Sequence, residues 1–260
     1  MARRGNIEQP QTADRFTVRV AVDYDGMSQL AADAVTDTVQ SHRGAALTLP
    51  TGETPRGMYQ ELVSRISVGR LDFSTVQFFC LDDYLGKEIT DEASLTGWLQ
   101  EVFLQPAHVP PTNIHFIPAT DPDPHSAAAR YDRDIQHAGG LELAVVGIGL
   151  NGHVGFNEPG SAPDSRTRVV DLTSVSREQN AAYFDGEQAI PERAITMGLG
   201  TILEARRIVL IVSGSSKAEI LRLALEGPIT SDIPASHLRS AGSRLAVIAD
   251  ADAVLKLSRI

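Results

Sequence analysis

Short apolar runs alternate with amphipathic runs along most of the chain. Several of the short runs are continuously apolar and rich in β-branched residues, which is typical of strands covered on both faces. The segments predicted to form strands are 17–22, 45–49, 76–81, 114–117, 143–148, 208–212 and 245–248. Between them, apolar residues recur at three- and four-residue spacing, as in helices with one buried face. The segments predicted to form helices are 27–41, 58–66, 125–137 and 217–226.

This alternation of strand and helix predicts an α/β fold, a three-layer α/β/α sandwich with a mainly parallel, Rossmann-like sheet. We expect a disordered lead-in at residues 1–14 and a single α/β catalytic domain over residues 15–260. Residues 161–192 form the longest stretch without a strong core pattern and are predicted to be a lid. Ligands of such sheets bind at the carboxyl ends of the strands.

Composition and charge narrow the classes of protein that fit. The chain of 260 residues is 42% hydrophobic and 22% charged, as in ordinary globular proteins. It has no apolar run long enough to cross a membrane, no secretory signal, and a single cysteine, Cys80, so a cytoplasmic setting is expected. The net charge of −10 argues against nucleic acid and anionic membranes as partners. An anionic metabolite therefore has to be bound by local basic groups and backbone N–H donors.

The loop at residues 147–161 follows a predicted strand and contains five glycines, His153 and Glu158. So many glycines disfavour a helix or strand and let the backbone pass close to a ligand. Histidine titrates near neutral pH, and a nearby carboxylate can orient it and tune its basicity. The alternative is a glycine turn with a solvated histidine and glutamate.

Residues 49–55 join a predicted strand to a predicted helix through a glycine turn. Thr54 suits the N-cap of that helix, and Pro55 suits its first position. The free N–H groups and positive dipole end of such a helix favour a phosphate. A plain capped helix is the alternative.

Asp82 and Asp83 follow the strongly apolar run 78–81. Because adjacent residues of a strand face opposite sides, only one of the two carboxylates should face the site. Apolar surroundings raise the pKa of a carboxyl group toward the range useful for a general base. A solvated pair at the end of a strand is the alternative.

Lys217 lies in the predicted first turn of a helix, after the strand 208–212. A lysine there opposes the helix dipole, so its position favours contact with an anion. The alternative is a lysine directed to solvent.

The run 147–161 resembles the signature of glucosamine-6-phosphate deaminases, G-x-G-x-[DN]-G-H-[IV]-[AG]-F-N-E-P, and matching motifs extend from about residue 47 to about residue 221. This family converts glucosamine 6-phosphate and water to fructose 6-phosphate and ammonia without a cofactor. The resemblance implies that His153, oriented by Glu158 and Asn151, assists ring opening, and that Asp82 is the base at C2. Asp83 stands where the family has a glutamate and is expected to support Asp82.

The resemblance also implies a phosphate site. The residues it implies are Thr51, Gly52, Glu53, Thr54 and Lys217. Glu53 departs from the small residue usual in the family; it would repel a phosphate if it pointed inward, and would leave its backbone N–H for the ligand if it pointed to solvent. Ala182 stands where the family has a lid arginine. Arg177 or Arg56 is a candidate replacement; otherwise phosphate affinity is weaker or the substrate differs at that end.

Other functions remain as alternatives. A 6-phosphogluconolactonase shares the Gly-x-Gly-x-x-Gly-His element but usually continues with a Ser-Leu-Phe-Pro-type run, whereas residues 156–159 read Phe-Asn-Glu-Pro. A non-catalytic sugar-phosphate sensor usually carries a DNA-binding segment and lacks the catalytic acid and histidine. A dinucleotide site is disfavoured because Pro159 does not continue into a helix. No metal site is expected, since the histidines lack ligand spacing, and a smaller, non-allosteric oligomeric form is favoured because Val170 stands where a lysine is common.

Overall fold

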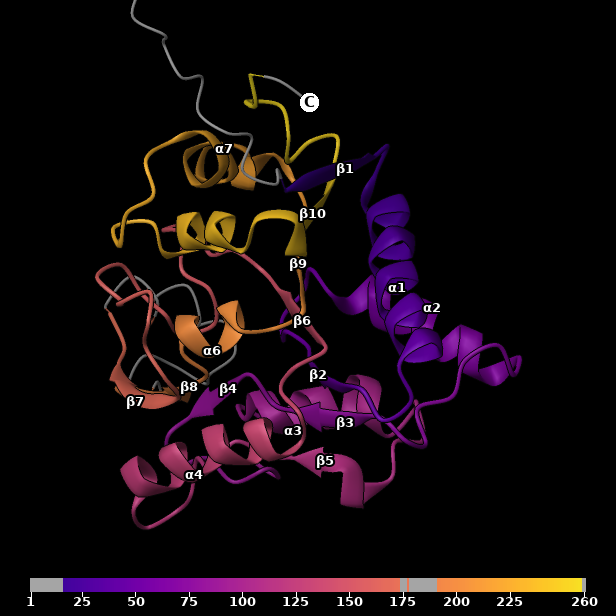
Figure 1. Ribbon diagram of the computed structural model, residues 1–260, viewed down its shortest axis with the longest axis vertical. Helices are drawn as coiled ribbons and strands as arrows, with labels where there is room; N and C mark the ends of the chain where they lie inside the picture. The colour runs from indigo at the N-terminus through magenta and orange to yellow at the C-terminus, as the bar shows by residue number, and fades with distance from the viewer. Residues whose placement is uncertain (1–15, 174–176, 178–190, 259–260) are drawn as a thin grey trace, which may run out of the picture.

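A seven-stranded parallel sheet forms the centre of the protein (Figure 1). The computed structural model describes residues 16–173, 177 and 191–258. The strands of the sheet, in spatial order, are β1 (Thr17–Ala21), β10 (Leu245–Asp250), β9 (Arg207–Val212), β6 (Leu143–Val146), β2 (Ala46–Thr48), β3 (Gln77–Phe79) and β5 (Ile114–His115). All neighbouring strands in it run parallel, so the predicted Rossmann-like sheet is confirmed.

Helices cover both faces of this sheet. They are α1 (Tyr24–Ser41), α2 (Arg56–Ser67), α3 (Leu95–Leu99), η1 (Gln100–Leu104), η2 (Pro111–Asn113), α4 (Pro124–His137), α6 (Leu199–Leu203), η5 (Ser215–Lys217), α7 (Ala218–Glu226) and η6 (Pro234–Arg244). α1 packs against β9, β10 and α2, whereas η6, with α7 beside it, lies on the opposite side of the same strands (Figure 1). The three-layer arrangement is thus confirmed. None of the described helices is both long and apolar enough to cross a membrane.

The central strands are the ones that the apolar pattern predicts best. All four residues of β6 are buried, and five of the six residues of β9 are buried. A strand covered on both faces has no solvent-exposed side, so it needs no alternation of polar and apolar residues. This explains why both strands read as continuous apolar runs.

A second, antiparallel sheet is absent from the sequence prediction. Its strands, in spatial order, are β4 (Asp82–Tyr84), β8 (Arg193–Thr196) and β7 (Arg168–Asp171). The strand expected over residues 76–81 is therefore wrong at its end, because β3 stops at Phe79 and β4 begins three residues later, at Asp82. β7 lies within the predicted lid, of which residues 174–176 and 178–190 are outside the described residues.

All four predicted helix starts shift by one to three residues, and two of these shifts bear on the site. α2 begins at Arg56, with Pro55 at the N-cap position and no side-chain hydrogen bond to the cap, so the predicted capping role of Thr54 is wrong. α7 begins at Ala218, because residues 215–217 form the short 3-10 helix η5. Lys217 still lies at the N-terminal end of α7, as the argument for an anion contact requires.

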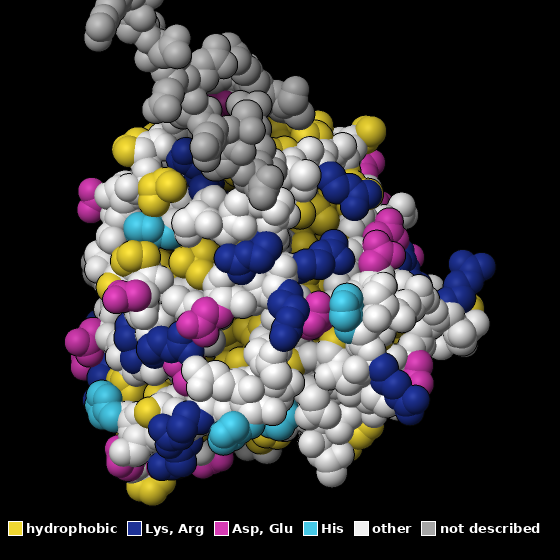
Figure 2. All heavy atoms as spheres, in the orientation of Figure 1, with side chains coloured by type: hydrophobic (Ala, Val, Ile, Leu, Met, Phe, Trp, Pro, Cys, Tyr) yellow, Lys and Arg dark blue, Asp and Glu magenta, His cyan; other side chains and the backbone are white. Residues whose placement is uncertain are grey.

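On the face drawn in Figure 2, basic and acidic side chains are interspersed over the described surface. The view shows no single large basic area on this face. With a net charge of −10, the field of the whole protein repels anions. Recognition of an anionic ligand depends on groups close to it.

A buried carboxylate fastens α4 to the segments that lead into β7 and α6. Asp132 on α4 is 6% exposed. It accepts hydrogen bonds from Thr167 N at 3.2 Å, from Thr167 Oγ1, from Thr201 Oγ1 at 3.1 Å and from Arg166 Nε at 2.9 Å. A buried carboxylate with several donors and a guanidinium is stabilising mainly because its partners would otherwise be unsatisfied.

We expect Asp132→Ala to lower the free energy of unfolding by about 3 kcal/mol, because it leaves two buried hydroxyls and a buried backbone N–H without their acceptor. Urea titration followed by circular dichroism measures this loss. Asp134→Ala, at an exposed position on the same helix, is the matched control and should change stability by less than about 0.5 kcal/mol. Equal losses in the two variants would contradict the structural role of Asp132.

Candidate active site

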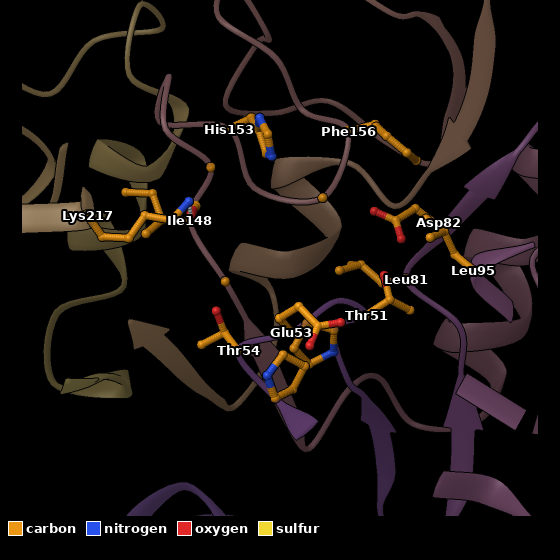
Figure 3. A pocket seen from close by; sticks show the side chains of 15 residues that line it. Thr51, Glu53, Thr54, Leu81, Asp82, Leu95, Ile148, His153, Phe156 and Lys217 are labelled. Atoms are coloured by element: carbon orange, nitrogen blue, oxygen red, sulfur yellow. Dashed lines mark hydrogen bonds between the residues drawn. The ribbon is translucent and has the colours of Figure 1, made fainter. Parts of the chain in front are cut away.

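The predicted site residues meet around one cavity at the carboxyl ends of β2, β6 and β9 (Figure 3). Those that line it are Thr51, Glu53, Thr54, Asp82, His153 and Lys217. The other three, Gly52, Asn151 and Glu158, adjoin the lining through the chain or through hydrogen bonds. The cavity thus brings together four segments of the chain, from Thr51 to Lys217, as the rule for ligand sites in parallel sheets predicts.

Asp82 is the carboxylate that faces the cavity. It is 5% exposed, and its Oδ1 has no hydrogen-bond partner among the described residues. Burial, and then the negative charge of Asp83, raise the pKa of the Asp82 carboxyl to about 7. Both protonation states of Asp82 are therefore populated near neutral pH, which suits a group that must accept and return a proton.

Asp83 faces the other way and binds the start of α3. Its carboxylate accepts hydrogen bonds from Ser94 Oγ at 2.7 Å and from the backbone N–H groups of Leu95 and Thr96 at 2.9 and 3.1 Å. Burial raises the pKa of Asp83, although these hydrogen bonds oppose the shift. The sequence argument that only one of the two acids faces the site holds, but it did not find Ser94 or α3 as the partner of the other.

His153 lies above the cavity, held by its own loop (Figure 3). Asn151 Oδ1 accepts from the backbone N of His153 at 3.1 Å, and Asn151 Nδ2 donates to Glu158 Oε2 at 2.8 Å. His153 Nδ1 is 3.9 Å from Glu158 Oε2. Asn151 therefore fixes the backbone of His153 and the carboxylate of Glu158 rather than the imidazole ring itself.

Burial lowers the pKa of His153; the charge of Glu158 opposes this shift, and the charge of Lys217 adds to it. The imidazole is accordingly neutral at pH 7. A neutral imidazole can accept a proton from a sugar hydroxyl and return it to the ring oxygen.

Two glycines allow this loop to close over the site. A Cβ on Gly149 would lie 2.2 Å from the ring of His153. Gly155 has a φ of +57°, and a Cβ there would lie 2.9 Å from Asp82 Oδ2 and 3.0 Å from Thr196 Oγ1. Glycine at these positions lets the loop touch both proposed catalytic groups, a close approach that the sequence signals only as general glycine richness.

At the opposite wall, the side chain of Glu53 turns toward Arg56. The two form an ion pair with Arg56 Nε 2.9 Å from Glu53 Oε1, and the Glu53 side chain is 67% exposed. The carboxylate of Glu53 is therefore exposed and paired with Arg56, although the residue still lines the cavity. Ala182, the other departure on this side, lies outside the described residues.

Lys217 closes the remaining side of the cavity. Its Nζ donates to the carbonyl of Ile148 at 2.8 Å, and burial lowers its pKa. The turn before it is held by Asp250, which accepts from Gly214 N at 3.0 Å and from Ser213 Oγ. Asp250 ends a strand far along the chain, and no sequence signal identified it as a support for Lys217.

Within the described part of the chain, no group of three or more His, Cys, Asp or Glu side chains is placed to hold a metal ion. The cavity lining supplies the carboxyl of Asp82, the imidazole of His153 and the ammonium of Lys217 for the candidate chemistry.

A family model described as glucosamine-6-phosphate isomerases/6-phosphogluconolactonase matches residues 24–247. The chain belongs to this family. One relative, glucosamine-6-phosphate deaminase 2 of Bacillus subtilis (strain 168), is 38% identical over 242 residues, which cover 92% of this chain and 97% of that protein. The resemblance to deaminases that the loop motif indicates is confirmed.

Solved structures separate the two enzyme classes in the family's description. A monomeric glucosamine-6-phosphate deaminase is similar with a TM-score of 0.89 and 36% identity, covering 93% of this chain and 100% of that one. A 6-phosphogluconolactonase from Thermotoga maritima has a TM-score of 0.71 at 18% identity, covering 91% of this chain and 99% of that one. The lactonase likeness concerns the fold alone.

We expect Asp82→Asn to make this family member more stable above pH 7. The unfolded-state pKa of an aspartate is near 3.8, and the folded value is about 7, so the wild type loses stability as pH rises between these values. The variant gains up to about 4 kcal/mol relative to wild type above pH 7, and the gain disappears toward pH 4.

Urea unfolding at several pH values measures this difference. Asp37→Asn on the exposed side of α1 is the control for loss of one negative charge. A difference between Asp82→Asn and wild type that does not change with pH would contradict the raised pKa of Asp82.

Proposed function

We propose that the protein is a glucosamine-6-phosphate deaminase, which converts D-glucosamine 6-phosphate and water to D-fructose 6-phosphate and ammonia. The observation that carries this proposal is the placement of Asp82 and His153 around one cavity that also contains Lys217. One group has a pKa near 7, and the other is a neutral imidazole. The relatives described above, with deaminase names and nearly full coverage, support the same reaction.

In the proposed mechanism, His153 takes the proton of the anomeric hydroxyl and delivers a proton to the ring oxygen, so that the pyranose opens to the aldehyde form. Glu158 stabilises the imidazolium that forms in between, since the two groups are 3.9 Å apart. Ionised Asp82 then removes the proton at C2 while a proton passes from the substrate's ammonium group to the C1 aldehyde oxygen, which gives a neutral enol-amine. Burial of Asp82 keeps this carboxylate basic enough for that step.

Protonation at C1 by Asp82 converts the enol-amine to the C2 imine of the ketose. Water adds to this imine, and the nitrogen leaves as ammonia, so one water is consumed and the base is regenerated. The substrate phosphate is bound at the wall formed by Lys217, Thr51, Gly52 and Thr54, where an ammonium and backbone N–H groups offset its charge.

Ammonia release from glucosamine 6-phosphate tests the proposal. Wild type should turn the substrate over, and Asp82→Asn should lower kcat by at least about 10³-fold while KM changes little, because the amide cannot accept the C2 proton. Glutamate dehydrogenase-coupled detection of ammonia measures the rate. Asp91→Asn, an exposed acid near α3, is the control. Absence of turnover by wild type, with hydrolysis of 6-phosphogluconolactone instead, would overturn the assignment in favour of the lactonase.

The raised pKa of Asp82 also predicts a pH profile. Because the base must be ionised, kcat/KM should fall as pH decreases through about 7. Asp83→Asn removes a neighbouring negative charge that raises the pKa of Asp82, so the acidic limb should move to lower pH by about one unit. Initial rates between pH 5 and 9 measure the shift. A limb that stays in place in a folded Asp83→Asn protein would refute the electrostatic coupling.

A further inference from the structure

The cavity needs more positive charge than its own lining supplies. Among the described residues that line it, Asp82 and Glu53 are carboxylates and Lys217 is the single ammonium or guanidinium. The ammonium of Lys217 already donates to the carbonyl of Ile148. A dianionic phosphate bound beside these groups would meet two carboxylates and one ammonium, and the net charge of −10 adds to the repulsion.

Arg56 lies just outside this lining. A shallow groove lined by Tyr24, Arg56 and Ser213 shares Glu53 and Thr54 with the active-site cavity, so these two residues form the wall between them. Figure 3 shows Glu53 and Thr54 along the side of the cavity that faces away from His153. Arg56 therefore lies across the wall of Glu53 and Thr54 from the cavity, in the neighbouring groove.

Two contacts hold the guanidinium in place. Its Nε donates to Glu53 Oε1 at 2.9 Å, and its Cζ lies 4.9 Å from the centre of the Trp98 ring. A guanidinium over an indole face is attracted by the ring quadrupole and keeps its in-plane donors free. No acceptor contacts Nη1 or Nη2 within the described parts of the chain. Arg56 thus presents an oriented pair of N–H donors that its own structure does not use.

We propose that Arg56 is a phosphate-specificity residue whose Nη groups bind the substrate phosphate, and that Glu53 holds Arg56 in position while weakening its attraction for that phosphate. This inference rests on the proposed function. Glu53 orients the guanidinium of Arg56 by accepting from its Nε. The negative charge of Glu53, however, offsets part of the positive charge that the phosphate would meet. The pair sets phosphate affinity below the maximum that the arginine alone would give.

The two members of the pair therefore have opposite predicted effects. Arg56→Ala should raise KM for glucosamine 6-phosphate about tenfold, the usual effect of losing a charged hydrogen bond near 1.4 kcal/mol, with kcat within about twofold. Arg56→Lys should recover part of this loss, because it restores the charge without the fork. Glu53→Gln should lower KM a few-fold, because the amide keeps the side chain without its charge.

Steady-state kinetics with glucosamine 6-phosphate and with unphosphorylated glucosamine provide the test. The Arg56 effect should appear only with the phosphorylated sugar, since the unphosphorylated one has no group to bind there. Arg70→Ala, an exposed arginine after the C-terminal end of α2, is the matched control for loss of one positive charge. An unchanged KM in folded Arg56→Ala, or an equal loss with both sugars, would overturn the proposal.

Calorimetric titration with inorganic phosphate separates this inference from the proposed function. Phosphate should bind about tenfold more weakly to Arg56→Ala than to wild type, whether or not the protein deaminates the sugar. Weakened phosphate binding without any ammonia release would keep the phosphate site and reject the reaction. Ammonia release by wild type, with phosphate binding unaltered in Arg56→Ala, would keep the reaction and reject the role of Arg56 in binding phosphate. Arg56→Gln, which retains the side-chain stem over Trp98, replaces Arg56→Ala if the shorter side chain prevents folding.

Discussion

Burial of two adjacent carboxylates, at the point where the chain leaves the parallel sheet, is the constraint on which the site depends. Asp82 and Asp83 are 5% and 2% exposed, and they face opposite sides of β4. The N-terminal end of α3 supplies Asp83 with donors, whereas Asp82 Oδ1 has none among the described residues. Because burial destabilises the ionised form of Asp82, the pKa of its carboxyl group is raised. With the hydrogen bonds that Asp83 has, Asp82 would be a weaker base.

The second sheet makes this arrangement possible. β4 pairs with β8 so that Asp82 lies opposite Thr196, and Thr196 Oγ1 accepts from the backbone N of Phe156 in the glycine loop at 3.1 Å. Asn157 adds two bonds of 2.8 Å to the carbonyls of Val154 and Met197. The loop that carries His153 is thereby tied to the strand beside Asp82. The relative position of the proposed acid–base groups follows from these polar contacts rather than from apolar packing alone.

The sequence pattern predicts those elements whose formation depends on residues close together in the chain. β6 and β9 are recognisable because β6 is fully buried and β9 is buried at all but its first residue, and the motif around His153 is recognisable because its residues lie within one loop. The second sheet is not, because strands of three or four residues carry too little periodicity and pair with segments far along the chain. Thr54 fails as a predicted cap because α2 starts at Arg56, with Pro55 at the N-cap position.

The charge of Lys217 couples the proposed phosphate end of the cavity electrostatically to the end that contains His153. Its ammonium donates to Ile148 in the loop that carries His153, and its charge adds to the lowering of the His153 pKa. An anion bound at Lys217 offsets that charge, so the imidazole becomes easier to protonate when the phosphate end is occupied. Ring opening needs a histidine that takes up a proton in one step and releases it in the next. In the proposed mechanism, a phosphate bound next to Lys217 would therefore favour that proton transfer only when a phosphorylated sugar is present, which would couple affinity at one end to chemistry at the other.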